Sequence, residues 1–355
     1  MKWNPLTGLV AVISCLSLVA AGCSSGSGDG DSELADQQLV FVNWGGQSVD
    51  AAKQGWLDPF TKKTGVEFAQ DSPTDNAKIK TMVTGGKTTW DVVDTDVASG
   101  GSECGTLFEE RPADFDMSEI SEEYISDDCG VPIIIQAVAL VYNKEAFGDA
   151  PPTSATDFMD TETYPGKRLV FNYPVGSAEP LLMADGALPD EIFPIDWNRI
   201  NDIFSRLGND LEPKDSIAQM DEMVQAGDFA MCFCYLGRLA TLPETAREKI
   251  GIVWDKTYLA WDGLYAVKGS ESPEAQMEFM QFLATAEGQK GYSEHLAYSP
   301  TTKGGLDEGD VSEGFQPYLP DFNQDKIEEI YNQDAEYWTE NIGQAMDDWT
   351  SAAAG

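Results

Sequence analysis

Residues 38–71 read QLVFVNWGGQSVDAAKQGWLDPFTKKTGVEFAQD, and this stretch decides the fold class that we predict for the chain. A short run of β-forming residues at 38–44 precedes helical spacing over 49–65, which stops at Gly65, and a second β-like run follows at 66–71. Next come a helical pattern at 76–86 and the apolar run WDVVDTD at 90–96. Such alternation of strands and helices is typical of an α/β sheet with many parallel strands.

The same alternation continues through the rest of the chain. A long β-forming run at 131–144, a buried strand at 229–237 and two further strands at 249–255 and 260–270 are expected between helical patterns. A helical pair is expected over 272–296, and an amphipathic helical region closes the chain at 325–352.

The first 23 residues, MKWNPLTGLVAVISCLSLVAAGC, have the pattern of a bacterial lipoprotein signal. Lys2 gives a basic start, an apolar stretch runs over 9–21, and Cys23 follows small residues. We predict a signal peptide at 1–22, lipidation of Cys23 and a flexible tether over 23–36, which would anchor the protein to the cell membrane outside the cytoplasm. The alternatives are an ordinary secretory signal and a membrane-spanning helix, for which the apolar run is short.

The chain is strongly acidic, with 61 Asp and Glu residues against 22 Lys and Arg residues and a formal net charge of −39. This charge disfavours nucleic acid and anionic lipid headgroups as partners and attracts cations, although an acidic surface is also a general aid to solubility. Because the chain of 355 residues exceeds what one hydrophobic core usually organises, two lobes are expected.

Four of the six cysteines lie beyond the signal segment and Cys23. Cys104 and Cys129 both lie in loop-like sequence, and a disulfide between them is predicted, since disulfides form outside the cytoplasm. Cys232 and Cys234 alternate with Phe233 in an apolar run, a pattern that favours buried free thiols on one strand face.

Motifs for metal, cofactor or hydrolytic chemistry are missing from the sequence. The single histidine, His295, excludes a histidine-rich metal site, so neither a metal nor a cofactor is predicted. The chain also lacks a GxSxG nucleophile elbow and a GxxxxGK[ST] phosphate loop. A secreted hydrolase that uses two carboxylates stays open as an alternative, since acids are plentiful. A surface adhesin or scaffold with an empty cleft is a further alternative, but we predict that the chain is not an enzyme.

The residues near the carboxyl ends of the expected strands are aromatic or acidic. In an open α/β sheet, ligands bind beyond these strand ends. Carboxylates accept charge-assisted hydrogen bonds from ammonium groups, and aromatic faces hold methylene groups and cations. No Arg or Lys is expected among them, so the set suits a ligand with ammonium ends. The candidate ligand-binding residues are Trp44, Asp94, Asp96, Glu179, Tyr235, Trp261, Asp262 and Tyr298.

The chain resembles ABC-transporter extracellular solute-binding proteins of the spermidine/putrescine type. The resemblance rests on FVNWGGQSVDAAKQGWLDPFTKKTGVEF, WDVVDTD, DDCGVPIIIQAVALVYNKEAF, APPTSATDFMDTETYPGKR, MVQAGDFAMCFCYLGR and VKGSESPEAQMEFMQFLATAEGQKGYSEHLAYSPTTK, which cover most of 38–303 in the family's order. It implies a type II periplasmic-binding-protein fold with two discontinuous lobes joined by a hinge. The expected lobes are 37–140 with 261–303 and 141–260, and 304–355 form a C-terminal helical region that packs on them.

The resemblance also implies a function. The chain would be a monomeric, lipid-anchored receptor that captures a small cationic solute of the polyamine class, putrescine or spermidine, and delivers it to an ABC permease. Trp44, Tyr235, Asp262 and Tyr298 match the family's polyamine site, and Cys104 and Cys129 match a pair in one sub-branch. Glu179 matches one acid of a two-acid cluster, but Gly176 stands where the second acid is expected. A different amine or an amino-acid-like compound stays open as the ligand.

Overall fold

One mixed sheet organises residues 34–354, the part of the chain that the computed structural model describes. The predicted signal segment 1–22 and Cys23 lie outside the described residues. In the sheet the strands run in the order β2-β1-β3-β8-β4-β7-β5-β6, and β9 pairs with β8. The strands are β1 (Gln38–Val42), β2 (Glu67–Asp71), β3 (Val92–Asp96), β4 (Val131–Asn143), β5 (Arg168–Phe171), β6 (Leu211–Lys214), β7 (Met231–Tyr235), β8 (Ile250–Ala266) and β9 (Glu329–Asn332).

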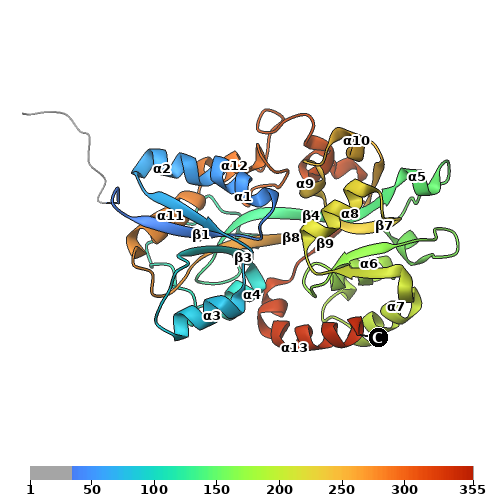
Figure 1. Cartoon of the computed structure of the whole chain (residues 1–355), viewed down its shortest axis with the longest axis horizontal. Helices are drawn as coiled ribbons and strands as arrows, with labels where there is room; N and C mark the ends of the chain where they lie inside the picture. Colours follow the sequence, from blue (N-terminus) through green and yellow to red (C-terminus); the bar gives the residue numbers. More distant parts are fainter. Residues whose placement is uncertain (1–33, 355) are drawn as a thin grey trace, which may run out of the picture. The chain divides into compact units, whose positions relative to one another are not determined.

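Helices cover this sheet, which confirms the predicted α/β class (Figure 1). The α-helices are α1 (Gln47–Ala52), α2 (Asp58–Thr64), α3 (Asn76–Thr84), α4 (Val97–Ser102), α5 (Lys144–Phe147), α6 (Ala178–Ala184), α7 (Trp197–Leu207), α8 (Ile217–Ala226), α9 (Leu236–Leu239), α10 (Glu244–Arg247), α11 (Pro273–Leu283), α12 (Ala286–Ser293) and α13 (Ala335–Ala353). A π-helical turn, η1 (Lys53–Leu57), joins α1 to α2, and short 3₁₀ turns occupy η2 (Glu122–Tyr124), η3 (Ala155–Met159), η4 (Pro189–Glu191), η5 (Gly208–Asp210), η6 (Gln316–Tyr318), η7 (Pro320–Phe322) and η8 (Gln324–Lys326).

The centre of the sheet is antiparallel, which differs from the expected run of parallel strands. β1 pairs in parallel with β2 and β3, and β5 pairs in parallel with β6 and β7. In contrast, β8 pairs antiparallel with β3 and with β4, and β4 pairs antiparallel with β7. The two strands expected at 249–255 and 260–270 are one continuous strand, β8, whose register against β4 shifts between Val138 and Leu140.

The last part of the chain departs from the expected helical region. Residues 329–332 form β9, which pairs in parallel with residues 256–259 of β8. The helix α13 then begins at Ala335, where the Asp334 side chain caps it by accepting a hydrogen bond from the Tyr337 backbone N–H. Figure 1 shows α13 running alongside α4 and α7, which both contact it.

Separate apolar clusters lie on the two sides of β4 and β8. Phe41, Trp56 and Phe279 belong to a cluster built from β1, α2, α11 and α12. Trp338 and Trp349 of α13 belong to a larger cluster with α6, α7 and β7. Because β4 and β8 contribute residues to both clusters, they hold the two sides together. The lobe boundaries expected from the sequence stay a prediction.

Among the described residues, we found no helix with both the length and the apolar character required to cross a membrane.

Candidate functional site

A cavity of about 540 Å³, part of it open to solvent, lies where the carboxyl ends of β1, β3 and β7 meet inner residues of β4 and β8. Six of the eight candidate residues line it, so sequence reasoning brought most of the site together. The lining comprises Trp44, Ser48, Asp94, Asp96, Ile134, Gln136, Phe171, Tyr173, Val175, Gly176, Ile217, Tyr235, Arg238, Ala260, Asp262, Tyr298 and Gln333. We call it the main cavity.

Two buried carboxyl groups, Asp94 of β3 and Asp262 of β8, form its acidic side. Trp44 Nε1 donates to Asp262 Oδ2 at 3.1 Å, and Gln136 Nε2 donates to the same oxygen at 2.6 Å. Among residues 34–354, Oδ1 of Asp94 has no hydrogen-bond partner. Burial raises the pKa of Asp262 to about 7, and burial together with the charge of Asp262 raises the pKa of Asp94 well above its usual value. The pair therefore holds a proton more readily than a solvent-exposed carboxyl group does.

Asp96 also lines the main cavity, but the protein already uses both of its oxygens. It lies opposite Asp262 in the β3–β8 pairing. Its Oδ1 accepts from the Ser99 backbone N–H at 2.9 Å and caps α4, and the Tyr173 hydroxyl donates to Oδ2 at 3.3 Å. Burial raises its pKa. Asp96 thus links β3 to the segment after β5, which makes it less free for a ligand than Asp94.

A buried cation faces this acidic side, contrary to the expectation of a set without Arg or Lys. Arg238 of α9 is only 3 % exposed and lines the main cavity. Its Nη2 donates to Ser48 Oγ at 3.1 Å and its Nη1 to the Gly45 carbonyl at 3.5 Å, and the guanidinium also hydrogen-bonds the Tyr298 hydroxyl and lies near the charge of Asp221. Among residues 34–354, no partner is found for its Nε. A guanidinium has five N–H donors, so donors stay unused. Sequence reasoning missed Arg238 because it lies three residues past the last residue of β7, one turn into a helix.

Aromatic side chains form the apolar walls of the main cavity. Tyr235 and Tyr298, which were predicted, are both buried. Gly176 has φ of +76°, and a Cβ there would lie 2.6 Å from the Tyr235 hydroxyl oxygen. The Tyr235 hydroxyl therefore occupies the space that a side chain at 176 would need, which explains why this position cannot carry the second acid of a polyamine site.

Glu179 does not line the main cavity, although the sequence suggested it as an ammonium acceptor. It is fully buried behind the lining, where Oε1 accepts from the Tyr258 hydroxyl and from Trp338 Nε1, both at 2.7 Å. Oε2 accepts from the Gly176 backbone N–H at 2.9 Å. Burial raises its pKa to about 7. These contacts make Glu179 a support for the loop at 176 and for α13.

Trp261 also lies outside the main cavity lining. Side chains alternate across a strand, so Ala260 and Asp262 face the main cavity and Trp261 faces the other side of β8. There its ring packs edge-on against Tyr124, with centroids 5.3 Å apart. The sequence expectation for Trp261 overlooked this alternation.

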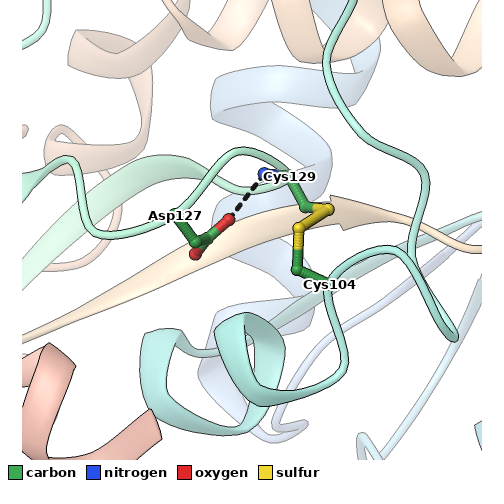
Figure 2. A group of neighbouring side chains, drawn as sticks. All are labelled: Cys104, Asp127 and Cys129. Atoms are coloured by element: carbon green, nitrogen blue, oxygen red, sulfur yellow. Dashed lines mark hydrogen bonds between the residues drawn. A yellow bond between two sulfur atoms is a disulfide. The ribbon is translucent and has the colours of Figure 1, made fainter.

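The cysteines lie in two pairs. Cys104 and Cys129 are joined as predicted, with an S–S distance of 2.03 Å, and the Asp127 carboxylate accepts from the Cys129 backbone N–H (Figure 2). Asp127 and the two sulfurs lie close enough to hold a metal, but bonded sulfurs are not the thiolates that metals need. The sulfurs of Cys232 and Cys234 lie next to each other in β7, and the expectation of free thiols stays a prediction.

The model of the family described as bacterial extracellular solute-binding protein matches residues 55–316. The chain belongs to this family. The gamma-aminobutyric acid-binding protein of Pseudomonas aeruginosa is 27 % identical over 332 residues, which cover 90 % of this chain and 92 % of that protein. A solved GABA receptor is 26 % identical with a TM-score of 0.78, covering 89 % of this chain and 97 % of its own. An ABC transporter substrate-binding protein from Bradyrhizobium japonicum is 27 % identical with a TM-score of 0.78, and the match covers 89 % of this chain and 99 % of that protein's chain.

These relatives are solute-binding proteins and not enzymes, so the predictions of a two-lobed binding-protein fold and of a solute-binding component of an ABC importer are confirmed at that level. The spermidine/putrescine type is not confirmed. A spermidine/putrescine substrate-binding protein from Streptococcus pneumoniae is 16 % identical with a TM-score of 0.65, covering 89 % of this chain and 99 % of its own. At that identity the likeness shows the shared fold alone.

Proposed function

We propose that this protein captures a small zwitterion, with a carboxylate at one end and an ammonium group at the other, for delivery to a membrane permease. The observation that carries the proposal is the presence of Arg238 in the same cavity as the Asp94–Asp262 carboxyl pair. A gamma-aminobutyrate-like ω-amino acid has these two charges on a short apolar stem. The names of the GABA-binding relative and the GABA receptor support this ligand class.

In this arrangement the ligand carboxylate accepts hydrogen bonds from the unused donors of Arg238. Such charge-assisted bonds are stronger than those between neutral groups. The ammonium group lies against the carboxyl groups of Asp94 and Asp262, which release a proton when it binds. The ring of Trp44 covers the same end of the ligand. Tyr235 and Tyr298 contact the methylene groups between the two ends.

A polyamine fits this charge pattern less well than a zwitterion does. Its second ammonium group would approach Arg238, and like charges in a buried site repel each other. Glu179, which the polyamine hypothesis needs, keeps both carboxylate oxygens occupied by protein donors. We therefore prefer the amino-acid-like ligand over putrescine or spermidine.

The cellular setting is part of the proposal. We infer that the receptor works outside the cytoplasm as a monomer, held to the cell membrane by lipid on Cys23, with 23–36 as its tether. The two expected lobes would close on the ligand, and a permease would recognise the closed form. The family description as extracellular supports the location.

Calorimetric titration of the mature protein with a matched ligand set tests the proposed function. The set comprises 4-aminobutyrate, butyrate, butylamine and putrescine, so that each charge is removed in turn. We expect binding of 4-aminobutyrate and a loss of at least tenfold in affinity for each of the other three. Tighter binding of putrescine than of 4-aminobutyrate would restore the polyamine hypothesis, and the absence of binding for all four would overturn the proposed ligand class.

A further inference from the structure

A second cleft shares one lining residue with the main cavity. The cleft contains Trp261, Phe193 and Ile330 with the carboxylates of Glu123 and Glu336, and we call it the outer cleft. Among residues 34–354, Gln333 alone belongs to the lining of both spaces. Gln333 directly follows β9, and its backbone N–H donates to the Leu259 carbonyl at 2.9 Å. The side chain therefore stands at a fixed place in the wall.

The orientation of the Gln333 carboxamide follows from one hydrogen bond. The backbone N–H of Trp261 donates to Oε1 at 3.1 Å, so the amide nitrogen must occupy the other position. Nε2 is buried and has no protein partner, and the whole residue is 4 % exposed. A buried amide donor without an acceptor costs stability. The wall side chain thus offers a hydrogen bond that no protein group accepts.

We propose that Gln333 sets the longest ligand that the main cavity accepts, and that a smaller residue there would join the main cavity to the outer cleft. This inference rests on the proposed function, because it concerns the length of the same zwitterionic ligand. Phe193 and Ile330 of the outer cleft suit an extended apolar stem, and Glu123 and Glu336 suit a positively charged end. If the two spaces are joined, the ligand that can extend from the main cavity into the outer cleft is a longer ω-amino acid.

The experiment measures affinity as a function of ligand length for the full mature protein and two variants, Gln333→Ala and Gln333→Ser. The ligands are 4-aminobutyrate, 6-aminohexanoate and 8-aminooctanoate. Asn332→Ala is the matched control, since Asn332 is exposed and lines only the outer cleft. Thermal melting of each variant establishes that it folds. Two replacements of different polarity are used so that the test still stands if one variant does not fold.

For wild type and Asn332→Ala, we expect the affinity to fall steeply from 4-aminobutyrate to the longer 6-aminohexanoate and 8-aminooctanoate. In both Gln333 variants the ratio of the affinity for 8-aminooctanoate to that for 6-aminohexanoate should rise by about tenfold, which corresponds to burial of the two additional methylene groups. An unchanged length profile in both folded variants would overturn the inference. If wild type binds none of the series, the proposed function fails, and a crystal structure of Gln333→Ala still decides the inference. A continuous cavity supports it, and two spaces that remain closed off from each other contradict it.

Discussion

Replacement of Arg238 by glutamine is the perturbation that separates the zwitterion from a cationic ligand. Glutamine keeps a polar group of similar reach but removes the charge. In the structure Arg238 hydrogen-bonds Ser48 Oγ and the Tyr298 hydroxyl and makes one long bond to the Gly45 carbonyl. The remaining donors are available to a carboxylate as a two-bond contact.

The size of the effect follows from those donors. Removing one partner of a buried charge pair costs about 2–5 kcal/mol, and we take the lower part of this range, about 2–4 kcal/mol, because the glutamine amide retains one bond. This corresponds to a loss of about 30- to 700-fold in affinity for 4-aminobutyrate. For butylamine and putrescine, which lack the carboxylate, we expect unchanged or higher affinity because a positive charge has left the cavity.

Calorimetric titration of Arg238→Gln and of wild type with the three ligands is the assay. Arg247→Gln serves as the control, since Arg247 lies on α10 outside the main cavity lining and should bind as wild type does. Equal losses for 4-aminobutyrate and for the two amines would refute the reasoning, because they would show a general disturbance and no recognition of the carboxylate.

Three further predictions follow from the same contacts. Glu179→Gln should lower the free energy of unfolding by about 1–3 kcal/mol in urea titrations, since one of its buried donors loses an acceptor, while affinity in the folded protein changes less than about threefold; a large loss of affinity with unchanged stability would contradict this. Since the folded-state pKa values of Asp94 and Asp262 are raised, with Asp262 at about 7, their contribution to the stability of the ligand-free protein is present below about pH 4 and is lost as the pH rises through about 7. Affinity for the ligand ammonium should rise over the same range with proton release near pH 7, measured by calorimetry in buffers of different ionisation enthalpy, and binding without any proton exchange would contradict it. Replacing both Cys104 and Cys129 by serine should lower the free energy of unfolding by about 3 kcal/mol, as expected for a loop of this length, with affinity nearly unchanged; unaltered urea stability would contradict it.

Predictions from sequence succeed where local patterns decide the structure. Strand and helix periodicity placed β1, β3 and β7 correctly, and the carboxyl ends of such strands converge, which brings Asp94 and Tyr235 into one cavity. Asp262 joins them from within β8. β9 escaped prediction because residues 329–332 lie within an amphipathic pattern, and only the pairing with β8 makes them a strand.

The remaining differences depend on the directions of individual side chains. Arg238 was missed because the search stopped at the last residue of the strand, whereas the first turn of the following helix also faces the main cavity. Glu179 was assigned to the ligand because no local pattern reveals that Tyr258 and Trp338, far away in sequence, occupy its oxygens. The direction of the Trp261 side chain was predictable in principle, since neighbouring residues of a strand point to opposite faces and Trp261 directly precedes Asp262.

The most direct test of the central claim is a crystal structure of the mature protein with bound 4-aminobutyrate. We predict that the ligand carboxylate lies within hydrogen-bond distance of the Arg238 guanidinium and that its ammonium group contacts Asp94 and Asp262, with Trp44 beside it. A ligand bound elsewhere, or bound in the main cavity without contact between its carboxylate and Arg238, would contradict the proposal.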